Sequence, residues 1–245
     1  KNSGSNVSQD QRLMLWWKGA VQRPDQLRQR MAFALSEILV ISDVAGTLRD
    51  DPVGMGEYYD ILVRGAFGNY RTLLEQVTKS PQMGKYLSML KNQKADPANN
   101  IRPDENYARE IMQLFSIGLN ELNPDGTPML DGGGAMIPTY DQSVVEGFAA
   151  TFTGWNYANS TNWDWPDENY LPMEPWEQYH ETAAKTVLDG NVIPANQTAQ
   201  QDLTMALDLI FNHPNVGPFI SHALIQRLVT SNPSPAYVGR VAAVF

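Results

Sequence analysis

The sequence predicts a mostly α-helical, multi-helix globular domain, and three observations favour that class. Apolar residues recur at steps of three and four over several stretches, which is the spacing of a helix with one buried stripe. Serine, asparagine, aspartate or proline precedes many of these stretches, as at helix starts. With 245 residues, 42% of them hydrophobic, the chain can bury a full core. We expect one domain over residues 1–245.

The expected helices follow these signals along the chain. The clearest begins after Pro24, where Leu27, Met31 and Leu35 form one stripe. Gly118 stands where a helix ending in a left-handed residue would place it. The stretches expected to be helical are 24–42, 70–78, 81–90, 104–118, 141–152, 202–212, 217–231 and 235–245.

Two segments break the helical pattern. Residues 119–139 contain short apolar pieces separated by Pro-Asp-Gly and Asp-Gly-Gly-Gly, which predicts tight turns in a small β-hairpin or meander. Residues 155–179 show no periodicity and contain repeated prolines, which predicts a long loop. Its many aromatic residues argue against disorder.

The composition excludes several classes of function. Eighteen Lys and Arg residues face 27 Asp and Glu residues, a formal charge of −9, so the chain has no electrostatic footprint for nucleic acid. The sequence has no cysteine, which excludes disulfides, thiolate metal sites and cysteine nucleophiles. No apolar run approaches the roughly 20 residues that a membrane-spanning helix needs. The sequence also has no Walker loop, dinucleotide fingerprint or nucleophile elbow.

Several blocks of sequence, in order along the chain, resemble the bacterial family of domains of unknown function called DUF1800. The string of an acidic residue followed by Glu-Asn-Tyr-Ala-Arg-Glu on a helix is the most specific of them. The resemblance implies a largely helical, exported protein, periplasmic or secreted, and a chain that is truncated at its C-terminus relative to the family. It implies no reaction and no catalytic residues. The blocks are 27–42, 66–94, 103–127, 151–155 and 224–241.

A polar row on the helix at 104–118 supplies the first candidate site. Glu105 and Arg109 are spaced i, i+4 and face away from the apolar side of the helix, with Glu110 beside them. One interpretation is an exposed ion pair. The other is a catalytic site, in which Arg109 clamps an anionic group while burial raises the pKa of Glu105 or Glu110 for proton transfer. A buried structural network is the third.

The loop at 155–179 supplies the second candidate site. Flat aromatic rings beside carboxylates suit a sugar, a peptide or an amine. The same rings could instead fold back as a lid on the helical core. The candidate ligand-binding residues are Trp155, Trp163, Trp165, Asp167, Glu168, Tyr170, Trp176 and His180.

A weak calcium motif lies at the first turn of the expected meander. Asn123, Asp125 and Asp131 place oxygen ligands near a turn glycine, but the pattern lacks the first Asp and the closing bidentate Glu of a calcium loop. An ordinary Pro-Asp-Gly turn explains the same residues. No zinc site and no cofactor other than calcium is predicted, since the three histidines show no ligand spacing.

These observations favour a protein that binds a carbohydrate-like polar ligand through the aromatic and acidic loop, with acid and base processing as an extension. The alternative is a non-catalytic protein that docks a secreted partner or a cell-surface assembly through the same loop, because large aromatic residues also favour protein interfaces.

Overall fold

The fold is described from a computed structural model, which covers residues 7–44, 46–164 and 170–245. Most of this chain is helical, so the mostly α class is confirmed. The α-helices are α1 (Gln9–Gln22), α2 (Gln26–Ser36), α3 (Gly46–Arg49), α4 (Pro52–Gly65), α5 (Tyr70–Thr78), α6 (Pro81–Tyr86), α7 (Asn106–Gln113), α8 (Gln142–Thr151), α9 (Ala199–Phe211), α10 (Val216–Leu228) and α11 (Pro235–Ala242). Short 3₁₀ helices occupy Pro97–Asn99, Glu177–Tyr179 and Leu188–Gly190.

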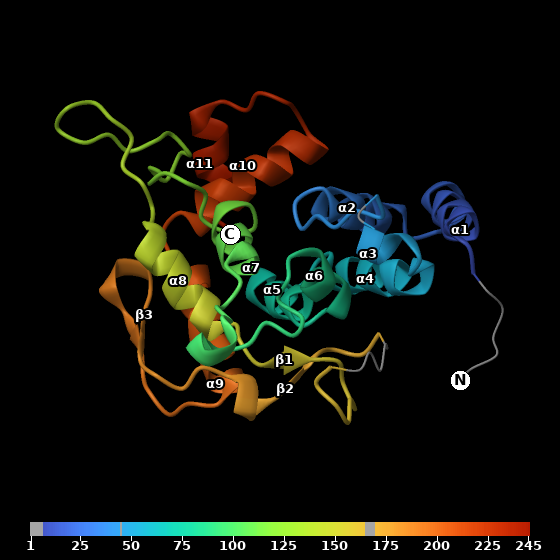
Figure 1. Ribbon diagram of the computed structural model, residues 1–245. Coiled ribbons are helices and arrows are strands. Elements are labelled where there is room, and N and C mark those ends of the chain that lie inside the picture. Colours follow the sequence, from blue (N-terminus) through green and yellow to red (C-terminus); the bar gives the residue numbers. More distant parts are fainter. Residues whose placement is uncertain (1–6, 45, 165–169) are drawn as a thin grey trace.

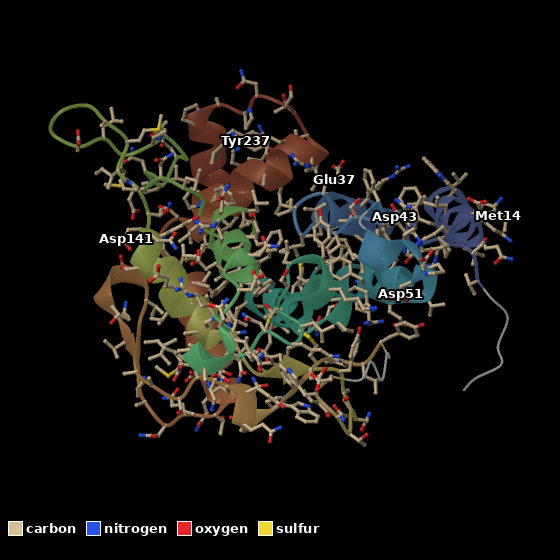
Figure 2. The ribbon with its side chains drawn as sticks, viewed as in Figure 1. Met14, Glu37, Asp43, Asp51, Asp141 and Tyr237 are labelled. Carbon is tan, nitrogen blue, oxygen red and sulfur yellow. The ribbon has the colours of Figure 1, made fainter. Side chains whose placement is uncertain are left out.

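The predicted start signals act locally in several helices. Asn69 accepts a hydrogen bond from the backbone N–H of Thr72 at 3.2 Å. Asp141, which lies at the start of α8 (Figure 2), accepts one from the backbone N–H of Val144 at 3.1 Å. Pro81 and Pro235 each occupy the first position of a helix, where a missing N–H costs nothing. The sequence did not predict α1, α3 or α4.

The hydrophobic core is centred on α7 and α8 (Figure 1). Helices α2, α4, α5, α6, α9 and α10 also contribute buried side chains to it. The rings of Phe148 and Phe152 stack with centroids 6.0 Å apart, and Tyr107 meets Phe152 edge-on at 5.3 Å. Tyr107 donates its buried hydroxyl to Thr78 Oγ1 at 2.6 Å, so α7 is tied to α5 within the apolar interior. These contacts fix α7 against its neighbours and leave its polar row on the outside.

The segment 119–139 forms the predicted meander through bridges rather than regular strands. Asn120 pairs with Pro138 in one isolated antiparallel β-bridge, and Leu130 pairs with Met136 in another. The meander extends from the helical body (Figure 1). At its base, Gly126 has φ +78°, and a Cβ there would meet Val238 of α11.

The segment 155–179 is closed at its base by a short antiparallel sheet. Strand β1 (Trp155–Asn156) pairs with β2 (Glu174–Pro175), and Trp155 lies opposite Pro175. A second small sheet joins β3 (Lys185–Thr186) to β4 (Val192–Ile193). The expected loop is therefore tethered at both ends.

The close approach of α8 to β3 generates a stability prediction. A Cβ at Gly147 would collide with the backbone carbonyl of Thr186, which cannot rotate away. We expect Gly147→Ala to lower the free energy of unfolding by about 1–3 kcal/mol, measured by urea denaturation.

The matched control is Gly56→Ala on α4, where a Cβ has no neighbour within 4 Å. This variant should leave the free energy of unfolding unchanged or raise it by up to about 1 kcal/mol, because alanine favours a helix more than glycine does. Equal stability of the two variants would contradict the proposed contact between α8 and β3.

Candidate functional site

The aromatic residues of the segment 155–179 divide into buried and accessible rings. Trp155 is 0% exposed and belongs to the main core, and Trp163 is 6% exposed. Trp163 stacks on Tyr179, with centroids 4.0 Å apart, and meets Trp176 edge-on at 5.9 Å. Trp155 and Trp163 therefore anchor the segment as the lid interpretation expects, and neither ring is open to a ligand in this structure. Trp176 remains half-buried.

Tyr170 is the accessible ring that reaches a cavity. It is 45% exposed and, with Pro172, overhangs a cavity of about 410 Å³ between α4, α5 and α6, here called the α4–α6 cavity. The predicted ligand residues Trp165, Asp167 and Glu168 lie outside the described residues. The polar side chains of the cavity wall are Glu57, Arg64, Glu75, Gln76, Lys79 and Gln82.

Several of these polar side chains are held in place by neighbours. Lys79 donates from Nζ to Gln200 Oε1 at 3.2 Å, and the same ammonium lies 5.6 Å from the centroid of the Trp155 ring. Trp155 does not line the cavity itself, but its ring contacts the Lys79 ammonium of the cavity wall through a cation–π interaction. Glu75 accepts from Arg71 at 2.8 Å. These groups line the cavity in fixed positions.

Gln82 gives the cavity a buried polar floor. Its side chain is 1% exposed, accepts from Ser80 Oγ at 3.1 Å and donates to Asp51 Oδ2 at 3.3 Å. A buried amide with both ends hydrogen-bonded keeps one orientation. The cavity therefore offers donors and acceptors in a defined arrangement.

The polar row of α7 forms a small network with the start of α8. Arg109 donates to Glu105 Oε2 at 2.8 Å and to Gln142 Oε1 at 3.2 Å, while Gln142 Nε2 donates to the same Glu105 oxygen at 2.9 Å. Both charged side chains remain more than one-third exposed. This row and the residues that line the α4–α6 cavity form separate sets, so the structure does not unite the two candidate sites.

Glu110 has a perturbed carboxyl group. Its Oε2 is buried and has no hydrogen-bond partner among the described residues, and the Tyr140 hydroxyl is in the same condition. Burial raises the pKa of Glu110, and the positive charge of Arg109 opposes the rise. Burial also raises the pKa of Tyr140, to which the charge of Glu110 contributes. The pKa of Glu110 is therefore raised, and its role in proton transfer stays a prediction.

The calcium candidates support two separate turns. Asp125 Oδ1 accepts from the hydroxyl of Thr127 at 2.6 Å, and Asp131 Oδ1 accepts from the N–H of Ala135 at 2.9 Å. These hydrogen bonds lower the pKa of both carboxyl groups. Asn123 donates to Thr127 as well. Across residues 7–44, 46–164 and 170–245, no group of three or more His, Asp or Glu side chains could hold a metal ion, and calcium stays a prediction.

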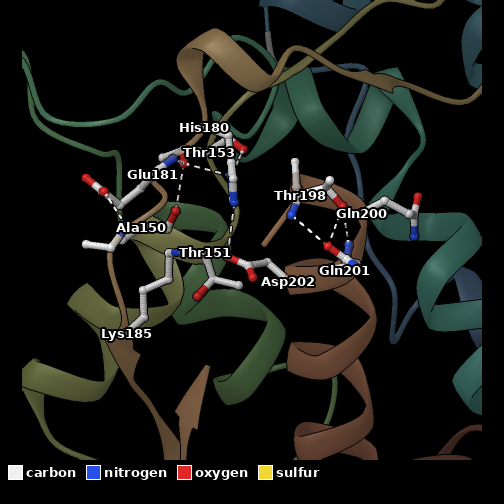
Figure 3. A network of polar contacts seen from close by, with 12 residues as sticks. Ala150, Thr151, Thr153, His180, Glu181, Lys185, Thr198, Gln200, Gln201 and Asp202 are labelled. Atoms are coloured by element: carbon white, nitrogen blue, oxygen red, sulfur yellow. Dashed lines mark hydrogen bonds and ion pairs between the residues drawn. The ribbon is translucent and has the colours of Figure 1, made fainter. Parts of the chain in front are cut away.

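His180 belongs to a buried charged triad with Lys185 and Asp202 (Figure 3). Asp202 Oδ2 accepts from Lys185 Nζ at 2.6 Å and lies 3.0 Å from His180 Nε2. His180 and Asp202 are 0% exposed and Lys185 is 4% exposed, so a ligand cannot contact these side chains in this structure. The triad joins the end of the aromatic segment to β3 and α9.

The surroundings of the triad explain how the fold accommodates it. Asp202 lies near the N-terminus of α9, where the helix dipole favours negative charge. His180 Nδ1 lies 3.0 Å from the carbonyl oxygen of Thr153, so both ring nitrogens face acceptors and a neutral ring can donate to only one of them. Lys185 and Asp202 could not be selected from the sequence, because isolated charged residues are typical of a solvated surface.

The comparisons with known proteins identify the family of the chain. The family described as "Protein of unknown function (DUF1800)" matches residues 1–245, and the chain belongs to that family. Comparisons with curated proteins and with solved structures gave no match. Over the described residues, no helix combines the length and the apolar character needed to cross a membrane.

The triad predicts a large cost when its acid is neutralised. We expect Asp202→Asn to lower the free energy of unfolding by about 3–5 kcal/mol, because Lys185 would stay buried without a counter-charge. Urea denaturation measures this loss. Asp208→Asn on the same helix removes an exposed partner of Arg71 and should cost less than about 1 kcal/mol. Equal losses in the two variants would contradict a buried ion pair.

Glu110 generates a prediction about pH. Its pKa is raised in the folded state, so the charged form is disfavoured there and stability falls as pH rises above the ordinary value of 4.5. Glu110→Gln should therefore raise the free energy of unfolding near neutral pH and lose this advantage as pH falls to about 4. The control is Glu105→Gln, which removes an ion pair and should not stabilise. The same advantage at both pH values would argue against titration of Glu110.

Proposed function

We propose that this protein binds a carbohydrate-like polar ligand in the α4–α6 cavity, with Tyr170 as an aromatic platform. One observation carries the proposal: the aromatic segment reaches over a cavity of about 410 Å³, and the wall of that cavity carries charged and amide side chains. Aromatic rings beside carboxylates were the sequence features that favoured a sugar. The cavity brings one such ring beside two carboxylates, a lysine and a buried amide.

The chemistry of the cavity suits a ligand with many hydroxyl groups. Each sugar hydroxyl both donates and accepts hydrogen bonds. Glu57 and Glu75 supply acceptors, Lys79 and Arg64 supply donors, and the amide groups supply both. The face of Tyr170 suits the apolar face of a sugar ring.

Binding is the primary proposed function. Acid and base processing of the bound ligand would extend it, and Glu57 and Glu75 are the carboxylates that line this cavity. Glu105, Arg109 and Glu110 would act on a ligand only at the separate α7 surface. An extracytoplasmic location, periplasmic or secreted, follows from the family resemblance and suits a carbohydrate ligand.

A docking function is the second candidate. Tyr170 and Leu171 are adjacent and are 45% and 51% exposed, so the same segment presents apolar area at the surface. Exposed aromatic and aliphatic side chains of this kind are typical of protein interfaces. The partner would be a secreted protein or a cell-surface assembly.

Intrinsic tryptophan emission tests the ligand proposal, because the Trp155 ring lies beside the Lys79 ammonium of the cavity wall. We expect a saturable change when the protein is titrated with one class in a panel of oligosaccharides, with and without calcium. Tyr170→Ala should weaken that binding by about tenfold, since truncating an aromatic contact costs more than about 1 kcal/mol at binding hot spots.

Tyr237→Ala on α11 is the matched control and should bind as the parent protein does. Equal weakening in the two variants would contradict a role for Tyr170. A flat response to every sugar would reject the carbohydrate proposal and favour the docking candidate.

A further inference from the structure

The α4–α6 cavity continues into a second cavity along the same pair of helices. Helices α4 and α5 pack side by side (Figure 1). A cavity of about 210 Å³, here called the α4–α5 cavity, lies at the turn between them. Arg64, Thr72 and Gln76 line both cavities, so these three side chains stand where the cavities adjoin. The two cavities therefore form one groove.

The groove follows one side of α5. Its wall residues on this helix are spaced at steps of three and four, which places them on a single face: Asn69, Thr72, Gln76 and Lys79. The helix rises about 15 Å between the first and the last of them. A groove of this length is longer than one sugar ring, so it suits a ligand of two or more linked sugar units.

The side chains at the junction have unused donors. Glu75 of the groove already accepts from Arg71 at 2.8 Å. In contrast, the Arg64 guanidinium makes no ion pair or hydrogen bond within the part of the chain that the structure describes. The side chains of Thr72 and Gln76 also make no hydrogen bond there. Three donor groups from two helices are thus available to one ligand group.

The electrostatics of the α4–α5 cavity favour an anion, although the whole chain has a formal charge of −9. No acidic side chain is among the described residues that line this cavity, and Arg64 is their one charged member. Glu57, which lies two turns before Arg64 on α4, lines only the α4–α6 part of the groove. A negatively charged group at the junction would therefore meet a cation first.

The helix ends at the turn agree with this direction. The N-terminus of α5 lies at the α4–α5 cavity, and the positive end of its dipole favours negative charge. The C-terminus of α4 ends at the same turn and would oppose it. However, Arg28 of α2 donates to the carbonyl oxygen of Val63 at 2.9 Å and so offsets the negative end of α4.

We propose that this groove binds an acidic oligosaccharide, with a uronate carboxylate at Arg64 and an adjoining sugar unit in the α4–α5 cavity. The inference rests on the proposed binding of carbohydrate in the α4–α6 cavity, and it specifies the class of sugar. The planar guanidinium of Arg64 can hold a carboxylate through two parallel N–H donors. Thr72 and Gln76 donate to the same unit from α5, and Tyr170 covers the other end of the groove.

Isothermal titration calorimetry of the full chain tests the charge and the length of the ligand. The probes are trigalacturonate, its fully methyl-esterified form and monomeric galacturonate. We expect trigalacturonate to bind at least about tenfold tighter than the neutral ester, since hydrogen bonds to a charged group are stronger. Trigalacturonate should also bind at least about tenfold tighter than the monomer, which fills only one part of the groove.

Arg64→Gln identifies the group responsible for the preference. This variant should weaken the binding of trigalacturonate about tenfold and leave the binding of the ester unchanged. Arg30→Gln is the matched control, because it removes an exposed arginine on α2 that lines neither cavity. It should bind all three probes as the parent protein does. Circular dichroism checks that both variants keep their helices.

Three results would overturn the inference. They are equal affinity for the acid and the ester, equal affinity for the trimer and the monomer, and a preference for the acid that survives Arg64→Gln. If the ester binds as tightly as the acid, the inference fails while carbohydrate binding stands. If none of the three probes binds, the inference fails, and the tryptophan titration with neutral oligosaccharides decides the proposed function separately.

Discussion

The buried carboxylate of Asp202 connects three parts of the chain that are separate in sequence. It accepts from Lys185 of β3 and lies beside His180, which ends the aromatic segment, while its own position belongs to α9. A buried charge is costly unless it is paired, so these three side chains must assemble together. Once His180 is fixed, Gly154 must approach its backbone closely, and a Cβ there would collide with it. This ion pair is therefore one of the contacts that place the aromatic segment.

The position of the aromatic segment also determines what lines the α4–α6 cavity. The N–H of Met173 donates to the carbonyl oxygen of Lys79 at 2.7 Å, so the segment that carries Tyr170 is hydrogen-bonded to the end of α5. Trp155, held in the core beneath, lies against the Lys79 ammonium. An aromatic ring and a cation that are far apart in sequence therefore reach one cavity because both ends of the segment are anchored. The cavity wall is a result of tertiary structure and not of a local motif.

Local chemistry made much of the fold predictable from the sequence. The turn signals of the meander and the caps at Asn69 and Asp141 act between near neighbours, so their outcome does not depend on distant residues. Helix α4 was missed although Asp51 caps it and Pro52 begins it. Helix α1 was missed because its apolar residues surround it instead of forming one buried stripe.

The candidate site was less predictable than the fold. Tyr170 could be selected from composition, but Glu75 and Lys79 lie on a helix whose polar face is typical of solvated surfaces. Trp155 and Trp163 were candidates for ligand contact, and the structure uses them as anchors instead, because aromatic area favours burial wherever the fold offers it. The sequence alone does not show which aromatic rings will be buried in the core.

The antiparallel pair at the base of the aromatic segment has a consequence for variation. Because β1 and β2 fix the two ends, exposed positions between them can accept insertions, whereas the buried Trp163 and Met173 must keep their places. Doubling the length of such a closed loop costs only about 0.6 kcal/mol of closure entropy. A lineage could therefore lengthen this segment at its exposed positions, and so alter the cavity rim, while retaining the same helical scaffold.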